Sequence, residues 1–318
     1  FVIEKIVLKK FAGVDNFEDF LKTLGDFETI FLGAVGYPGV PDHVSLWGLL
    51  LPIRRTFEQY VNLRPVKLLR GVESPLRKYA AGDIDFVVVR ENTEGEYSNI
   101  GGRIHSGFPH ETVIQNTVFT RFGSERIIRY AFELAARSGK EKVCGATKSN
   151  GINWTMPFWD ELFNAIGEDE FPKIERQLVH IDALSAFFVL KPDQFEVVVA
   201  SNLFGDILTD LGAAIVGGIG IAPSANINPA REYPSMFEPV HGSAPDIAGK
   251  GIANPVGQIW SAKMMLDHVG QSELGERLLN TTEEVLAEGV VRTPDFGGTS
   301  TTSGVADAVI EKLSQLDW

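Results

Sequence analysis

A short apolar segment followed by two aspartates at helical spacing constrains the fold of this chain more than any other stretch. Residues 195–200, Phe-Glu-Val-Val-Val-Ala, form the kind of β-branched run that makes a buried parallel strand. In the next segment, 202–212, Asp206 and Asp210 are four residues apart, so on a helix they share one face. The ordinary alternative is a solvated helix face. Because ligands of open α/β sheets bind just beyond the carboxyl ends of strands, two carboxylates here suit a hard cation such as Mg²⁺ or Mn²⁺.

Composition and charge limit the class of protein. With 318 residues, of which 44% are hydrophobic, the chain can bury a large core, and we expect two domains. The net charge of −13 argues against a nucleic-acid partner. No apolar run of transmembrane length and no signal peptide occur in the sequence, so we expect no membrane partner. The single cysteine, Cys144, lies in an apolar segment, which indicates a core residue. One cysteine cannot form an intramolecular disulfide, which fits a reducing cytoplasm or organelle matrix, and of these we expect the cytoplasm.

Strand and helix patterns alternate along the chain and predict an α/β fold. No G-x-G-x-x-G follows a strand pattern, so the Rossmann fingerprint is absent. Apolar or alternating patterns predict strands at 1–8, 28–36, 84–89, 113–120, 142–147 and 177–181. Apolar stripes and end signals predict helices at 15–24, from Ser124 as N-cap to Gly139, and at 157–166, 258–268, 272–288 and 305–316. If the segment 46–65 is helical, Arg54 and Arg64 lie on one side of it and Pro65 ends it.

Several predicted strands carry an ionisable residue at their carboxyl ends. These residues are Arg90, Lys148 and Asp182, followed by Asp206 and Asp210. Each of them alone would more often be a surface charge. Together they predict a cleft that holds cations for a carboxylate and anions for a metal ion.

The same residues, in this order, resemble the metal-dependent β-decarboxylating dehydrogenases, a family that includes isocitrate and 3-isopropylmalate dehydrogenases. The resemblance runs from about Gly33 to the end of the chain. It depends on Arg54, the segments 62–65 and 89–95, Lys148, Asp182, and the segments 202–210 and 241–246. The resemblance implies two α/β domains that differ from a Rossmann fold, with the active site in the cleft between them.

The domain boundaries and the partner also come from the resemblance. It implies a discontinuous cofactor-binding domain, 1–59 with 217–318, and a substrate-binding and dimerisation domain, 60–216. An arm near 98–117 would interlock a homodimer whose active sites are shared between subunits. Family members begin with a strand that runs into a Gly-Asp-Gly-Ile-Gly segment. No such segment is present, so we expect that the cofactor-binding domain lacks its N-terminal part here.

Each charged residue of the predicted cleft has a counterpart in the family. The residues implied to bind the substrate carboxylates are Arg54, Arg64 and Arg90. The planar guanidinium fork of arginine is suited to binding a carboxylate. The implied ligands of Mn²⁺ or Mg²⁺ are Asp206 and Asp210, with Asp182 of the partner subunit. The implied catalytic residues are Tyr97 as general acid and Lys148, reaching in from the other subunit, as general base, together with Asp182.

A glycine-rich stretch, 237–255, is the implied cofactor loop. Its expected NAD contacts are His241, Gly242, Ser243, Ala244, Asp246 and Asn254. An acidic residue suits a ribose diol and repels a 2′-phosphate. Asp246 therefore favours NAD over NADP.

The residues before Arg54 favour a small substrate. Isocitrate enzymes have a serine six positions and an asparagine four positions before this arginine, where the chain has Gly48 and Leu50. Isopropylmalate enzymes have a glutamate seven positions before it, where the chain has Trp47. The segments 42–48 and 90–97 are most similar to the tartrate and decarboxylating D-malate dehydrogenases, which use NAD, Mn²⁺ or Mg²⁺ and a stimulating K⁺.

The resemblance therefore predicts NAD-dependent oxidation and oxidative decarboxylation of a C4 2-hydroxy dicarboxylate, with Trp47 and Leu50 beside the substrate. A 3-isopropylmalate dehydrogenase remains an alternative within the family. A non-catalytic regulatory subunit is an alternative of another class. The presence of Lys148, Tyr97 and all three aspartates argues against it.

Overall fold

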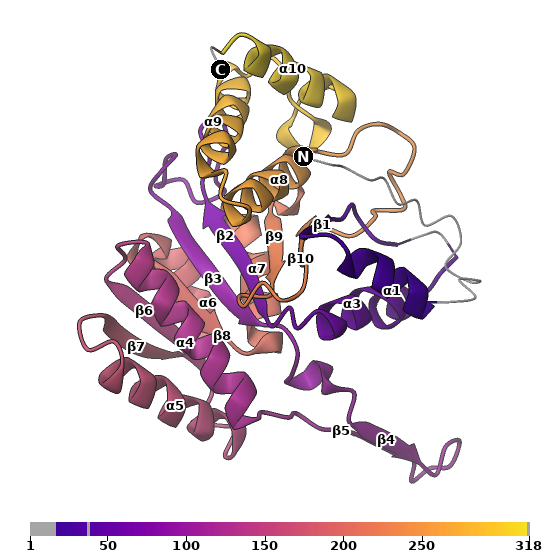
Figure 1. Cartoon of the computed structure of the whole chain (residues 1–318), viewed down its shortest axis with the longest axis vertical. Coiled ribbons are helices and arrows are strands. Elements are labelled where there is room, and N and C mark those ends of the chain that lie inside the picture. The colour runs from indigo at the N-terminus through magenta and orange to yellow at the C-terminus, as the bar shows by residue number, and fades with distance from the viewer. Residues whose placement is uncertain (1–16, 37–38, 317–318) are drawn as a thin grey trace.

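A mixed eight-stranded sheet runs through the computed structural model, which describes residues 17–36 and 39–316 (Figure 1). Its strand order is β1-β10-β9-β2-β3-β8-β6-β7. Its strands are β1 Thr29–Phe31, β2 Val61–Lys67, β3 Asp85–Glu91, β6 Lys142–Thr147, β7 Glu175–His180, β8 Val197–Ala200, β9 Pro223–Ile227 and β10 Ser235–Pro239. The pairs β10–β9, β9–β2 and β2–β3 are antiparallel, and the other pairs are parallel.

Helices cover both faces of this sheet. They are α1 Phe17–Gly25, α2 Asp42–Ser45, α3 Leu51–Thr56, α4 Arg121–Arg137, α5 Thr155–Asp169, α6 Ile181–Leu190, α7 Asn202–Ile215, α8 Val256–His268, α9 Ser272–Glu288 and α10 Thr302–Ser314. A π-helical turn, Leu46–Leu50, joins α2 to α3. Helix α8 packs on β9, β10 and α9, and α10 packs on α9.

Side chains alternate between the two faces of the central strands, as the period of two requires. In β3, Phe86 and Val88 belong to the buried cluster that includes Phe188 of α6 and Leu208 of α7. The alternate positions, Val87 and Val89, pack against or belong to the cluster that includes side chains of α4 and α5. Helices α4 and α5 therefore cover one face of this part of the sheet, and α6 and α7 cover the other (Figure 1).

Four strands that were expected to end in charged residues do end at a common edge. Strands β3, β8, β6 and β7 are parallel neighbours. Parallel strands have their carboxyl ends at the same edge of a sheet. Arg90, Lys148 and Asp182 therefore lie at or just beyond one edge, together with the start of α7.

The segment 46–65 is not one helix, so the condition under which Arg54 and Arg64 would lie on one side of it is not met. Arg54 lies in α3, which ends at Thr56, whereas Arg64 lies in β2. Glu58 has a left-handed backbone, with φ of 45°, which turns the chain between the two elements. Pro65 does not end a helix, because it lies inside β2 opposite Val87.

Several predicted bounds also change. Helix α4 is capped by Thr120, whose hydroxyl accepts from the Gly123 N–H, and Ser124 is a buried residue inside the helix. The strands predicted at 28–36 and 113–120 are shorter, Thr29–Phe31 and Thr112–Gln115. The strand predicted at 1–8 and the first residues of the helix predicted at 15–24 lie outside the described residues.

A hairpin projects from the body of the molecule at the place predicted for the dimer arm (Figure 1). It consists of β4 Gly101–Ile104 and β5 Thr112–Gln115, paired antiparallel, and every residue of both strands is exposed. Large apolar side chains are among them, with Val113 67% exposed. The division into two domains stays a prediction. Within residues 17–36 and 39–316, every helix is too short or too polar to cross a bilayer.

Candidate active site

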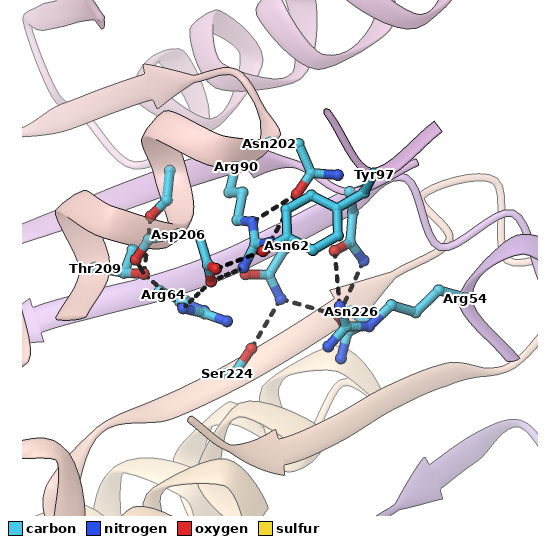
Figure 2. A network of polar contacts seen from close by, with 12 residues as sticks. Arg54, Asn62, Arg64, Arg90, Tyr97, Asn202, Asp206, Thr209, Ser224 and Asn226 are labelled. Atoms are coloured by element: carbon cyan, nitrogen blue, oxygen red, sulfur yellow. Dashed lines mark hydrogen bonds and ion pairs between the residues drawn. The ribbon is translucent and has the colours of Figure 1, made fainter. Parts of the chain in front are cut away.

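Asp206 lies at the centre of a charged cluster at the start of α7 (Figure 2). The guanidinium group of Arg90 donates to Asp206 Oδ1, and Nη1 of Arg64 lies 3.6 Å from the same oxygen. The hydroxyl of Tyr97 donates to Oδ2 at 3.0 Å. Three residues predicted for substrate binding and proton transfer therefore meet one predicted metal ligand.

A glycine in α7 permits this approach. A Cβ atom on Gly205 would lie 2.6 Å from Cγ of Arg90, closer than real Cβ contacts come. Beside it, Asn202 Oδ1 accepts from Nε and Nη2 of Arg90 at 3.1 and 2.7 Å. The side chain of Arg90 is thus aligned along the first turn of the helix and directed at Asp206.

The three predicted carboxylate-binding arginines are buried, with exposed fractions of 7% for Arg54 and Arg64 and 3% for Arg90. Burial, together with the positive charge of Arg90, lowers the pKa of Arg64 to about 9. Nη1 of Arg64 donates to the Thr209 hydroxyl at 2.5 Å. The buried Nε atoms of Arg54 and Arg64 have no hydrogen-bond partner among the described residues. These unpaired donors are suited to an anionic ligand.

A buried polar network that the sequence analysis did not identify supports Arg54. Nη2 of Arg54 donates to Glu238 Oε1 at 2.9 Å, and the same oxygen accepts from the Asn226 amide. Asn62 donates to Asn226 and to the Ser224 hydroxyl (Figure 2). Asparagine is depleted in strands. The asparagines in the segments that form β2 and β9 were therefore the sequence feature from which such a network could have been predicted.

The two carboxylates of α7 have different environments. Burial raises the pKa of Asp206, but Arg90, Arg64 and the Tyr97 hydroxyl outweigh it, so that the pKa lies below its usual value. Burial is the main cause that raises the pKa of Asp210, and the charge of Asp206 adds to it. No hydrogen bond or ion pair to Asp210 is found within the described residues of the chain. Its carboxylate therefore has free lone pairs.

This donor set fits a hard cation in part. Asp206 and Asp210 lie one helical turn apart. Both offer carboxylate oxygen atoms, the kind of ligand that Mg²⁺ or Mn²⁺ prefers. In the described part of one chain, however, no three His, Cys, Asp or Glu side chains are grouped for a metal ion. A complete metal site needs a further ligand. Asp182 of the partner subunit is predicted to supply it.

Lys148 and Asp182 form a pair of their own. Nζ of Lys148 donates to Asp182 Oδ1 at 2.7 Å, and this hydrogen bond lowers the pKa of Asp182. Within the described chain, neither residue has a hydrogen bond or an ion pair with Asp206 or Tyr97. The structure therefore brings Tyr97 and Asp206 together but does not bring Lys148 or Asp182 of the same chain to them.

A cavity of about 90 Å³ connects the arginines with the predicted cofactor loop. Its lining includes Arg54, Arg64 and Leu50 from the substrate side and His241 and Gly242 from the cofactor side. The loop packs against the turn after β1, because a Cβ atom on Gly36 would lie 2.3 Å from Oγ of Ser243. Residues predicted to bind the substrate and residues predicted to bind the cofactor thus border one space.

The remaining predicted cofactor residues lie further along the loop. Ala244 has a left-handed backbone, with φ of 42°, and Asp246 is exposed. Asn254 is buried: its amide donates to Asp295 at 2.9 Å and its carbonyl oxygen accepts from the Val256 N–H. The loop combines close backbone approach with a polar, accessible surface, which fits a dinucleotide.

The predicted specificity residues lie on the π-helical turn Leu46–Leu50. Such turns are rare and occur often at functional sites. Leu50 lines the cavity, whereas the described lining residues do not include Trp47. The indole of Trp47 lies beneath the guanidinium group of Arg55, 5.4 Å from the ring centroid. The role of Trp47 beside the substrate stays a prediction.

The fold and the site together define an α/β protein whose sheet edge presents buried arginines, paired carboxylates and a loop suited to a dinucleotide. The isocitrate/isopropylmalate dehydrogenase family matches residues 18–309. The chain belongs to this family, and the predicted family, α/β fold and oxidoreductase class are confirmed.

Known proteins similar to this chain include two curated bacterial enzymes and one solved structure. The "probable tartrate dehydrogenase/decarboxylase" of Bacillus subtilis is 59% identical over 94% of this chain and 83% of its own length. The "D-malate dehydrogenase [decarboxylating]" of Escherichia coli is 57% identical over 92% and 82%. The crystal structure of isocitrate dehydrogenase from Methylococcus capsulatus has a TM-score of 0.84 and 36% identity, and the match covers 94% of this chain and 85% of that one.

Proposed function

We propose that this protein catalyses NAD-dependent oxidation and oxidative decarboxylation of a C4 2-hydroxy dicarboxylate, D-malate or tartrate, with Mn²⁺ or Mg²⁺. The observation that carries this proposal is the group of buried arginines, two of which have unpaired donors, beside Asp206 and the cavity. The relatives named for tartrate and D-malate support the choice of acid.

The residues of this chain have distinct tasks in that reaction. Arg54, Arg64 and Arg90 bind and orient the two carboxylates of the substrate. Lys148 of the partner subunit accepts the C2 hydroxyl proton. Burial and the charge of Asp206 raise the pKa of Tyr97, so its phenol carries a proton at neutral pH and can donate it to C3 after CO₂ leaves.

Two further groups would supply the remaining chemistry. Asp206 and Asp210, with Asp182 of the partner subunit, would hold a divalent cation, which would supply Lewis-acid polarisation of the C2 oxygen. The loop that contains residues 241–254 would hold NAD, which would supply the hydride acceptor for C2. K⁺ as a stimulating ion is part of the same proposal.

A homodimer is the form in which the site would be complete. The exposed apolar side chains of the β4–β5 hairpin and the separation of the Lys148–Asp182 pair from Asp206 support this inference. The single cysteine, Cys144, is buried, and burial raises its pKa to about 12. This agrees with an inert core thiol, and we infer a cytoplasmic enzyme.

The test is NADH formation by the purified protein given D-malate, each tartrate isomer or 3-isopropylmalate, with Mn²⁺ or with EDTA. We expect D-malate to give pyruvate, CO₂ and NADH in equal amounts, and only with the metal present. A higher kcat/KM for 3-isopropylmalate would establish the rival dehydrogenase. Binding of NAD without NADH from any of these acids would favour a regulatory subunit.

A further inference from the structure

Arg55 connects two parts of the site, one of which, Tyr97, is 42 residues further along the chain. Its Nη2 donates to the backbone carbonyl oxygen of Tyr97 at 2.7 Å. Its guanidinium carbon lies over the ring of Trp47, 5.4 Å from the centroid. Arg55 directly follows Arg54 in α3. It therefore contacts the predicted specificity residue on one side and the residue assigned as general acid on the other.

The backbone around Tyr97 is held from the hairpin side, where the Gly95 N–H donates to the Val118 carbonyl and the Gln115 amide donates to the Glu96 carbonyl, both at 2.9 Å. From the side of α3, Arg55 supplies a contact to this turn. Tyr97 lies in a single 3₁₀ turn, Glu96–Ser98, between Gly95 with φ of 72° and Asn99 with φ of 59°. The closing bond of this turn, from Ser98 N–H to the Gly95 carbonyl, is long at 3.3 Å. The turn leads directly into the projecting hairpin. A contact from α3 is thus well placed to set the position of this segment.

The side chain of Tyr97 depends on that position. Its hydroxyl reaches Asp206 at 3.0 Å, and Arg90 lies 5.6 Å from the ring centroid (Figure 2). Displacement of the backbone carbonyl would change where the phenol proton lies relative to the substrate. Proton transfer requires heavy atoms within hydrogen-bond reach, about 2.6–3.2 Å, so a small displacement is sufficient to slow it.

An exposed arginine would ordinarily be a solvated charge or a weak surface ion pair. Arg55 has no ion pair with a carboxylate in the described part of the chain. Its charge is directed instead at a carbonyl oxygen and an indole face, and hydrogen bonds that involve a charged group are the stronger kind. Both partners belong to the proposed active site, which distinguishes Arg55 from a solubilising residue.

We propose that Arg55 is a positioning residue for Tyr97: it holds the turn Glu96–Ser98 against α3, which carries Arg54 and follows the π-helical turn that carries Trp47. This inference rests on the proposed function. In the predicted domain division, the contact joins residues of the cofactor-binding domain to residues of the substrate-binding domain. Arg55 thereby couples the segment that selects the substrate to the group that protonates the product.

The kinetic test compares Arg55→Met with Arg55→Lys, which retains a donor, and with Arg176→Met, which removes a partly exposed arginine of β7. In Arg55→Met we expect kcat with D-malate to fall about tenfold while KM changes little, because proton transfer typically contributes 10²–10⁴-fold and is only partly lost. The solvent deuterium isotope effect on kcat should increase as proton donation becomes rate-limiting. Arg55→Lys should stay within about threefold of the unmodified protein, and Arg176→Met should not differ from it.

Hydrogen–deuterium exchange of residues 95–99 provides a readout that does not require turnover. These amides should exchange faster in Arg55→Met than in the unmodified protein and in Arg176→Met, at an unchanged Tm. Unchanged exchange there, or a fall in kcat without a change in the isotope effect, would overturn the positioning role. If the unmodified protein oxidises none of the acids, the proposed function fails, and the exchange result alone decides whether Arg55 holds the turn.

Discussion

Replacing the two aspartates of α7 separately by asparagine should have different effects on the stability of the metal-free protein. Asp206 accepts from buried Arg90 and from Tyr97, and its pKa is lowered. Asp210 has no such partner in the described chain, and burial raises its pKa. At neutral pH the charge of Asp206 therefore stabilises the fold, whereas the charge of Asp210, which is exposed and has no such partner, contributes little.

The size of the effect follows from these contacts. A hydrogen bond to a charged group contributes about 1.5–3 kcal/mol, and the asparagine would retain a neutral acceptor. The Asp206 side chain is 35% exposed, so solvent screens part of its charge. We expect Asp206→Asn to lower the free energy of unfolding by about 2 kcal/mol, a decrease in Tm of roughly 4 °C. Asp210→Asn should be neutral, within about 0.5 kcal/mol, or slightly stabilising.

Thermal unfolding in EDTA and then in Mn²⁺ measures both consequences, with Asp169→Asn at the exposed end of α5 as control. A bound ligand stabilises the folded state, so Mn²⁺ should raise the Tm of the unmodified and control proteins but not of Asp206→Asn or Asp210→Asn. Activity should fall by orders of magnitude in both site variants. Equal destabilisation by the two site variants would refute the electrostatic reasoning, and a retained Mn²⁺ shift would refute the ligand assignment.

Three further predictions concern the catalytic pair, the substrate and pH. Co-expressed Lys148→Met and Tyr97→Phe chains should recover activity in mixed dimers, because a shared site leaves one of the two sites with neither lesion; activity no higher than that of either parent would exclude sharing. Trp47→Ala should change the ratio of kcat/KM for 3-isopropylmalate over D-malate by about 10–200-fold in favour of the bulkier acid, and steady-state kinetics on both acids measures this ratio. The pKa of Asp206 is lower in the folded than in the unfolded state. Its charge therefore stabilises the folded protein above the unfolded-state pKa, and this stabilisation is lost as the pH falls through the folded-state pKa. In acid-unfolding titrations, Asp206→Asn should therefore lose less stability than the unmodified protein.

Part of this architecture could be predicted because the local pattern and the long-range arrangement agree. The runs around Val88, Cys144 and Val198 are apolar on both sides, since each strand is covered by helices on both faces. Parallel neighbours then place the residues after each strand at one edge. That is why Arg90 and the Asp206–Asp210 pair could be identified without knowledge of the strand order.

The local sequence pattern did not predict the secondary structure correctly where strands pair antiparallel in the middle of the sheet. The ten-residue separation of Arg54 and Arg64 fits helical spacing, yet Arg64 lies in a strand opposite Val88. Pro65 is a common end signal for a helix, but its neighbours in β2 are held by β3. Tertiary pairing overrode the local preference, and the two arginines border the same cavity from different elements.

The buried network beneath Arg54 was beyond prediction for a further reason, because it depends on register. Asn62 faces Asn226 only because β2 pairs with β9 at that register, and it faces Arg90 on its other side through β3. A shift of one residue would turn Asn62 to the opposite face, so that Asn226 and Ser224 would lose the donor that Asn62 supplies. The charged residues of the site can be recognised together from their types and their places after predicted strands, but the groups that hold Arg54 depend on three strands and their exact pairing. Substitutions at Asn62 or Asn226 should therefore impair the site although neither residue carries a charge.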